Sequence, residues 1–266
     1  MDWRAGKFAI ANAIHLDLTH QQEHYARALG RHLRPGDKWL DVGCGHTIVP
    51  DWAMPIDEQK RLVASAAMMV GVDVDESIAL HPLLPNRVEA TGEALPFRDE
   101  SFDLVTANLV VEHVVNPQRF LAEIHRVLRP GGHFLFVTPN LLSPLMFAAH
   151  IMPGNLVKRT AEFLESRHEE DIFPAHYRMN TAVAIGRLAS EAGFEVEELS
   201  LVGTVGVLDR LGPVAWAECL LLKGLARLFH GKLLPDILAV LKRGVAGLNG
   251  QASGTAGAQQ CGPRKE

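Results

Sequence analysis

Short apolar runs recur along the first half of the chain, and each ends beside glycines, acids or polar residues. They predict five β-strands, at residues 38–42, 67–73, 83–91, 101–108 and 133–138, with the weakest pattern at 83–91. Continuous apolar runs of this length are typical of strands that are buried on both faces. The pattern therefore predicts a sheet covered by helices on its two sides.

Helical periodicity fills the intervals between these runs. Tyr25, Leu29 and Leu33 recur at four-residue spacing and predict a helix over residues 20–33. Further helices are expected at 57–69, 117–128 and 181–192. The glycine pair at 131–132 would end the second of these three. Strands separated by helices indicate an α/β fold with a doubly wound parallel sheet, whose strands have their carboxyl ends at one edge.

The alternation of predicted strands and helices is interrupted twice in the second half of the chain. Residues 141–180 and 205–234 are predicted to be inserts, and two more strands are expected at 195–202 and 236–242. From residue 247 onward Gly, Ala, Gln and Ser dominate, and such a composition buries too little surface to offset its ordering entropy. We therefore expect an N-terminal helical segment at 1–36, one domain at 37–246 that holds both inserts, and a disordered tail at 247–266.

Composition and charge narrow the class of protein. A length of 266 residues with 47% hydrophobic residues fits one large α/β domain with insertions, and no apolar run reaches the length of a membrane span. The net charge of −5 lacks the basic excess of proteins that grip nucleic acid. Three scattered cysteines and an N-terminus without a long apolar stretch favour a soluble protein of the reducing cytoplasm.

A glycine loop follows the first predicted strand. Asp41, Gly43, Cys44 and Gly45 belong to it, and glycines without a Cβ let the backbone approach a ligand closely. A tight turn without any ligand stays open as an alternative. A nicotinamide-binding loop would need a further glycine where Ile48 stands, and an acid upstream repels phosphates. The loop therefore favours a ligand that carries an amine. A nicotinamide dehydrogenase remains an alternative, which the chemistry of the loop disfavours.

Residues 39–45, which read WLDVGCG, resemble the first motif of class I S-adenosylmethionine-dependent methyltransferases, in particular the small-molecule enzymes of the methyltransferase type 11 group. The likeness continues in the order of that family at 70–73 (VGVD), 93–105 (EALPFRDESFDLV), 112–113 (EH), 120–132 (FLAEIHRVLRPGG) and 138–140 (TPN), with a later piece at 191–194 (EAGF). The resemblance implies a Rossmann-like fold with a seven-stranded sheet, an antiparallel last strand and S-adenosyl-L-methionine as the cofactor.

The resemblance also implies roles for individual residues. The amino-acid end of the cofactor would lie beside the loop, its ribose beside Asp73 or Asp75, its adenine beside Glu93 and Ala94, and its sulfonium beside Asn108. Two departures stand out, since Thr91 and Thr47 occupy positions where the family often has an acid and a third glycine. The cofactor-binding residues expected in this way are Asp41, Gly43, Gly45, Asp73, Asp75, Glu93, Ala94 and Asn108.

Methyl transfer from a sulfonium is an in-line displacement, so alignment and the exclusion of water do much of the work. A base is needed only when the acceptor holds a proton at neutral pH. His113 follows the fourth predicted strand and is the candidate for general base or acceptor contact. An alternative is that it packs beside the cofactor or caps a helix. Cys44 is better interpreted as a small packing residue than as a nucleophile.

Both inserts leave the carboxyl edge of the sheet and are expected to cover the cleft. In the first, His176, Tyr177 and Arg178 are predicted to face the acceptor, with an ion-paired lid surface as the alternative. The spacing of His168, Glu169, Asp171 and His176 matches no mononuclear metal site, so no metal is expected. Residues 213–229 form an apolar helical stretch, for which packing within the chain is the default and a lipophilic acceptor, a second subunit or a membrane surface are alternatives.

The sequence thus predicts a methyltransferase that acts on a small-molecule or lipid-like acceptor. The alternative from another class is a catalytically silent regulatory protein that binds S-adenosylmethionine without turnover. Nucleic acid is not expected as a partner.

Overall fold

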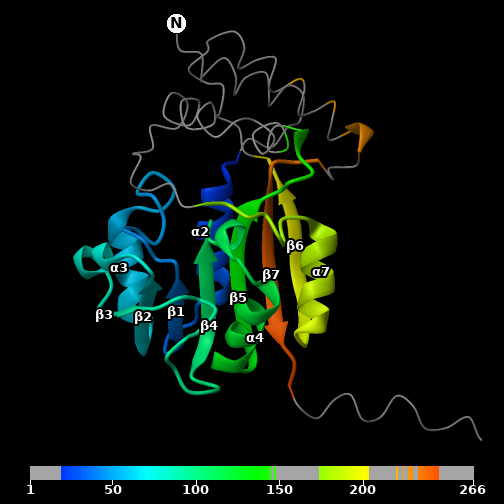
Figure 1. The fold of residues 1–266 in the computed structure, drawn as a ribbon. Coiled ribbons are helices and arrows are strands. Elements are labelled where there is room, and N and C mark those ends of the chain that lie inside the picture. Colours follow the sequence, from blue (N-terminus) through cyan, green and yellow to red (C-terminus); the bar gives the residue numbers. More distant parts are fainter. Residues whose placement is uncertain are drawn as a thin grey trace, which may run out of the picture.

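The computed structural model describes residues 19–144, 147, 174–203, 220, 224, 227–229 and 233–245 (Figure 1). The expected tail at 247–266 lies outside these residues, as do residues 1–18 and most of both inserts. Among the described residues, no helix has the length and apolar character needed to cross a membrane.

A seven-stranded sheet forms the centre of the molecule, in the order β3-β2-β1-β4-β5-β7-β6. The strands β1 to β5 pair in parallel, and β7 runs antiparallel between β5 and β6. The predicted doubly wound, mostly parallel sheet with an antiparallel last strand is therefore confirmed. The strands are β1 Lys38–Val42, β2 Met68–Asp73, β3 Asn86–Glu89, β4 Phe102–Asn108, β5 Leu128–Pro139, β6 Phe194–Val202 and β7 Asp236–Arg243.

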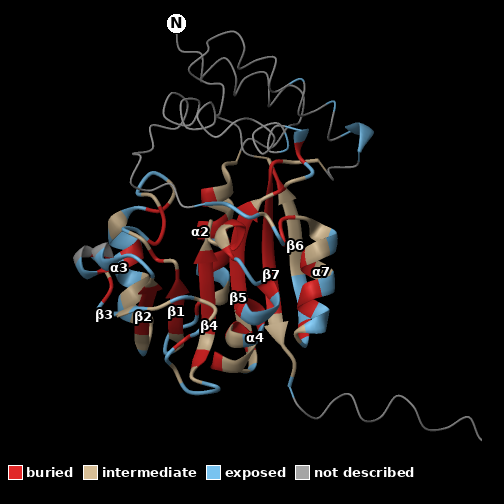
Figure 2. Cartoon of the chain, viewed as in Figure 1, coloured by how far each residue is buried: buried red, intermediate tan, exposed pale blue. Residues whose placement is uncertain are grey.

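Helices cover both faces of the sheet, as Figure 2 shows by the buried strands between helices with exposed outer sides. One face packs against α2 (Gln21–His32) and α3 (Ile56–Ser65), and its core includes Leu29 and Trp39. The other packs against α4 (Pro117–Val127) and α7 (Ala182–Glu191), around Phe120 and Ile185. Burial of these apolar faces is the main contribution to the stability of the layered fold.

One expected helix end and one expected helix cap are wrong. The helix expected at 57–69 ends at Ser65, because Met69 already pairs with Trp39 in the sheet. The helix expected to close at the 131–132 glycine pair ends at Val127, and the glycines lie inside β5. There the register shifts between two successive pairs of β4 with β5, which is typical of a β-bulge. The glycines serve this irregularity rather than a helix cap.

The strand order indicates where along the edge of the sheet a ligand would bind. β1 pairs with β2 on one side and with β4 on the other, so the chain order reverses around β1. In open α/β sheets, ligands bind outside the carboxyl ends of the strands at such a switch point. The loops after β1, β2 and β4 are therefore the place to look for a site.

Candidate active site

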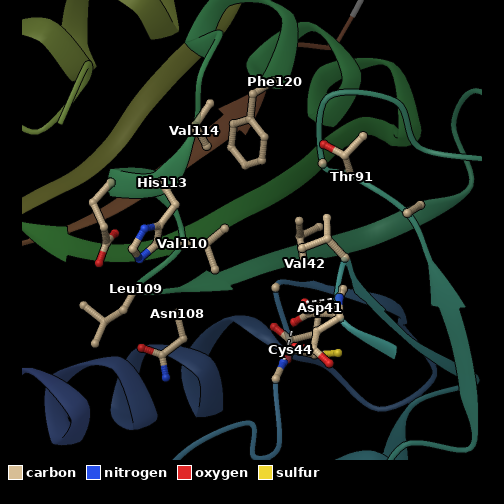
Figure 3. Close-up of a pocket in the computed structure, with 18 of the residues that line it drawn as sticks. Asp41, Val42, Cys44, Thr91, Asn108, Leu109, Val110, His113, Val114 and Phe120 are labelled. Carbon is tan, nitrogen blue, oxygen red and sulfur yellow. Dashed lines mark hydrogen bonds between the residues drawn. The ribbon is translucent and has the colours of Figure 1, made fainter. Parts of the chain in front are cut away.

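A cavity of about 650 Å³ lies at this switch point. Its walls are the loop after β1, the end of β2, residues 90–93, the end of β4 with the following 3-10 helix η2 (Val111–His113), part of α2, and residues 174 and 176. Figure 3 shows Asp41 and Cys44 on one side of this space and His113, Val114 and Phe120 on the other. The volume falls within the range of about 300–1,000 Å³ that is usual for small-molecule sites.

The glycine loop takes a backbone path that other residues rarely adopt. Gly43 and Gly45 have φ angles of +67° and +46°. The Gly43 N–H donates to the Val72 carbonyl at 2.7 Å, and the Gly45 N–H donates to the Asp73 carboxylate at 2.8 Å. A Cβ at Gly43 would overlap the side chain of Val110. The loop is thus fastened to the end of β2 and tightly packed against the segment after β4.

Asp41 is buried beneath the loop and still lines the cavity. The Thr106 hydroxyl donates to its carboxylate at 2.6 Å, and the Trp39 indole N–H donates in turn to the Thr106 oxygen at 2.8 Å. Burial raises the pKa of Asp41 to about 7, with a further contribution from the charge of Asp73. The carboxyl group therefore sits near the balance between its neutral and charged forms, and a cationic ligand would favour the charged form.

Asp73 joins two loops through its carboxylate. One oxygen accepts the Gly45 N–H at 2.8 Å, and the other accepts the Asp75 N–H at 3.1 Å. Both acids line the cavity, and Asp75 is exposed. A charged carboxylate held by backbone amides keeps spare lone pairs for the hydroxyl groups of a ligand.

Glu93 is anchored to the start of α4. Its carboxylate accepts the Asn116 N–H at 2.8 Å, and its carbonyl accepts the Arg119 guanidinium at 2.9 Å. Glu93 and the neighbouring Thr91 line the cavity, whereas Ala94 is not among the lining residues. Residues 90–93 therefore form this part of the cavity wall.

Asn108 faces the cavity from the end of β4, and a residue that the sequence analysis missed holds it there. The Gln22 and Asn108 amides donate to each other at 2.8 Å, and Asn108 also donates to the Ile48 carbonyl at 3.1 Å. Gln22 is a buried polar residue on the same face of α2 as Leu29, and it lines the cavity. A glutamine within the apolar stripe of a helix was the available signal.

The segment after β4 supplies an apolar wall and a histidine. Leu109, with a φ of +57°, Val110 and Val114 line this part of the cavity together with His113. The His113 Nδ1 atom lies 3.1 Å from the carbonyl oxygen of Pro174. Because a carbonyl only accepts, Nδ1 carries the proton in this contact, and in a neutral ring the basic nitrogen is then Nε2. The geometry suits a base.

The structure brings one of the three expected acceptor-facing residues to the cavity. His176 lines it, while Tyr177 and Arg178 are not among the lining residues. The N–H groups of His176 and Tyr177 both donate to the Glu112 carbonyl, at 2.7 and 3.0 Å. The Arg178 side chain instead donates to the Val115 carbonyl. The segment is held by its backbone, which leaves Arg178 turned to a different neighbour.

Glu112 is a second residue of the cavity wall that received no role from the sequence. It is buried, and its carboxylate accepts the Thr138 hydroxyl at 3.0 Å. Asn180 donates to that hydroxyl at 2.7 Å. This hydrogen-bonded chain joins η2, β5 and the segment before α7. It fixes the residue that precedes His113.

The length of the loop after β1 fits the presence of Thr47 where the family often has a third glycine. Residues 43–55 separate β1 from α3, which makes a long connection, and the Thr47 hydroxyl closes part of it by donating to the Val49 carbonyl at 2.8 Å.

Cys44 is buried, and burial raises the pKa of its thiol far above the usual range. A protonated, buried thiol is suited to packing.

Similarity to known proteins decides the family. A methyltransferase domain model matches residues 40–136, which run from Leu40 in β1 through the glycine loop to Phe136 in β5. A relative named "Probable S-adenosylmethionine-dependent methyltransferase" in Mycolicibacterium smegmatis is 31% identical over 187 residues, covering 68% of this chain and 59% of that protein. This chain belongs to the class I S-adenosylmethionine-dependent methyltransferases. S-adenosyl-L-methionine is the cofactor of the family.

Further comparisons agree with this methyltransferase family. A demethylmenaquinone methyltransferase of Symbiobacterium thermophilum is 37% identical over 114 residues, covering 39% of this chain and 43% of that protein. A crystal structure of an S-adenosylmethionine-dependent methyltransferase from Mesorhizobium loti matches with a TM-score of 0.52 at 18% identity, covering 82% of this chain and 96% of that one. The structural match shows the fold alone. The match spans 59% of the length of the Mycolicibacterium smegmatis relative and 43% of that of the Symbiobacterium thermophilum relative.

Proposed function

We propose that this methyltransferase is active and transfers the methyl group to a small, largely apolar acceptor with an ionisable hydroxyl, such as a phenol or a hydroquinone. The observation that carries the proposal is the surrounding of His113. His113, whose Nδ1 donates to the Pro174 carbonyl so that Nε2 is the basic nitrogen of the neutral ring, stands in a wall made of Leu109, Val110 and Val114. An apolar acceptor fits that wall, and a hydroxyl on the acceptor carries the proton that a base would remove.

The name of one relative supports the lipid-like, aromatic character of the proposed acceptor. The Symbiobacterium thermophilum protein is named for demethylmenaquinone, a lipid-like aromatic compound. Its similarity covers less than half of either chain, so the name suggests a chemical class and no particular compound. Lipid-like and small hydroxylated aromatics are therefore the acceptors to test first.

The cavity also fits the cofactor that the family uses. A buried carboxyl group with a pKa near 7, Asp41, stands ready to face the ammonium of an amino acid. The lack of a Cβ at Gly43 and Gly45 would let the amino-acid end approach the loop closely, and Asp73 or Asp75 would accept hydrogen bonds from ribose hydroxyls. Residues 91–93 would contact the adenine, and Asn108 would lie near the sulfonium. These assignments are part of the proposal.

The residues of the chain would divide the reaction between them. When bound, S-adenosylmethionine supplies a methyl group on a positively charged sulfur, which leaves as the neutral thioether. The apolar wall excludes water and aligns the acceptor with the methyl carbon. His113 Nε2 takes the proton that the acceptor loses as the new bond to the methyl carbon forms. Pro174 keeps the ring in the required tautomer through Nδ1.

The test uses the purified full chain and S-adenosylmethionine with a labelled methyl group. Hydroxylated aromatic acceptors, with and without isoprenoid chains, are compared with aliphatic amines and carboxylic acids of similar size. Label in the hydroxylated aromatics is the expected outcome. Label confined to amines or carboxylic acids would contradict the acceptor class. Binding of the cofactor in a calorimeter without transfer to any acceptor would favour the silent regulatory alternative.

A further inference from the structure

Three potential metal ligands meet away from the cavity, on the α2 side of the sheet. One ligand atom each of His32, His133 and Glu197 lies within 4.8 Å of the others. The His133 Nε2 and Glu197 carboxylate oxygen are 3.1 Å apart, and the rings of His32 and His133 have centroids 5.2 Å apart. None of the three takes part in the methyl-transfer site.

Each ligand comes from a different element of the fold. His32 is the last residue of α2, and His133 lies on β5. Glu197 is the extra residue of β6, because the pairing with β7 passes from Val196 directly to Glu198. A β-bulge re-aims a side chain, and here it turns a carboxylate toward two imidazoles. Because the three positions are far apart in the chain, no spacing pattern could reveal them.

The donor set matches a known preference of transition metals. Two imidazoles and one carboxylate are ligands that Zn²⁺ accepts at about 2.0–2.2 Å, with water completing the tetrahedron. At such bond lengths two ligand atoms of a tetrahedral ion lie about 3.4 Å apart. The 3.1 Å contact is close to this spacing, and the ligand atom of His32 lies within 4.8 Å of the other two. We propose that His32, His133 and Glu197 bind Zn²⁺ or a similar divalent transition-metal ion.

The charges around the cluster leave Glu197 available. The nearest basic residue of the helix, Arg31, pairs with Glu198 at 2.9 Å. The His133 side chain keeps 15% of its surface exposed and that of Glu197 keeps 40%, so an ion can enter from solvent. Lys242 pairs with His133 in the sheet register, and its positive charge limits the affinity.

A bound ion would fasten the end of α2 to β5 and β6. This matters for the cavity at the other end of the helix, where Gln22 holds Asn108. An ion that binds only the folded chain stabilises the folded state. The stabilisation grows with the logarithm of the ratio of metal concentration to dissociation constant. The expected role is therefore structural, as a clamp on the helix that contributes to the cavity wall.

The test is calorimetric titration of Zn²⁺ into tag-free, chelator-treated full chain, with thermal unfolding measured in parallel. We expect one ion per chain at this site and a Tm that rises with Zn²⁺. His32→Gln and Glu197→Gln should each weaken binding more than tenfold and abolish the Tm rise. Glu198→Gln, next to the cluster but paired with Arg31, is the matched control and should bind as the unaltered chain does.

Two results would overturn the proposal. One is no measurable binding of Zn²⁺ by the unaltered chain. The other is equal binding by the unaltered chain and both ligand variants, which would assign the ion to other histidines among the 13 in the sequence. Circular dichroism of each variant establishes that it is folded, so a loss of binding reports on the ligands.

Discussion

The side-chain amides of Gln22 and Asn108 hydrogen-bond to each other in both directions, at 2.8 Å each. Gln22 belongs to α2, which precedes the matched methyltransferase domain at 40–136, and Asn108 ends β4 inside it. The pair therefore makes a helix outside the family model part of the cavity wall. It fixes the amide plane of the residue that we place near the sulfonium.

Removal of this pair should weaken cofactor binding. Gln22→Ala leaves the amide of Asn108 without two hydrogen bonds in a partly buried place, at a cost of about 1–3 kcal/mol. We expect the dissociation constant for S-adenosylmethionine to rise about tenfold in calorimetry. Arg27→Gln, on the exposed side of the same helix, is the control and should leave it unchanged. Equal constants for Gln22→Ala and the unaltered chain would show that Asn108 needs no support.

The two loop glycines should respond differently to alanine. Both have positive φ angles, but a Cβ meets Val110 at Gly43 and open space at Gly45. Gly43→Ala should therefore lower the free energy of unfolding more than Gly45→Ala. At Gly45 the only cost is the conformational strain of about 1–2 kcal/mol, without a steric clash. Denaturant unfolding measures both. Gly186→Ala, within α7 and without a nearby atom, should be neutral or stabilising by up to about 1 kcal/mol. The reverse order of the loop variants would contradict the packing described.

Asp41 should make stability depend on pH. Its pKa is 3.8 in the unfolded chain and about 7 in the folded one, so the folded state binds more protons between these values. The contribution of the neutral group is fully present below pH 4 and is lost as the pH rises through 7. Each unit of pKa difference corresponds to about 1.4 kcal/mol.

Asp41→Asn isolates this effect. The free energy of unfolding of the unaltered chain, minus that of the variant, should fall from pH 4 to pH 7 and then stay level. Denaturant titrations without cofactor at several pH values measure it. A difference that is constant over this range would mean that Asp41 titrates normally.

His113→Gln should separate a base from a packing residue. For acceptors whose hydroxyl is neutral at pH 7, kcat should fall by about 10²–10⁴. For acceptors with a hydroxyl that is already ionised, the fall should be less than about tenfold, because no proton has to be removed. The cofactor dissociation constant should stay the same in both cases. An equal loss of kcat for both kinds of acceptor would assign His113 a packing role, and His24→Gln on α2 controls for the exchange of a histidine.

The sheet could be predicted because its strands are buried on both faces. Runs such as Phe134 to Val137 and Ile237 to Leu241 are buried and apolar throughout, and that pattern can be recognised without a structure. The helix ends were harder. Val127 passes directly into β5, and no glycine or proline marks that step. Where a helix and a strand share an apolar run, only the sheet register decides the boundary.

The site was predicted where a position in the chain implies a position in space. Asp73 and Asn108 end their strands and Asp41 is the next-to-last residue of β1, so the edge of the sheet brings them together. Gln22 and Glu112 were missed because their places depend on tertiary packing. Similarly, Tyr177 has a φ of +52°, and the hydrogen bonds of its segment to Glu112 decide which side chains face the cavity.

The most direct test of the central claim is a calorimetric titration of the full chain with S-adenosylmethionine and with its demethylated product. The account predicts that each binds once per chain in the cavity at the switch point, and that Gly43→Ala weakens both while Gly186→Ala weakens neither. The absence of measurable binding of either compound by the unaltered, folded chain would contradict it.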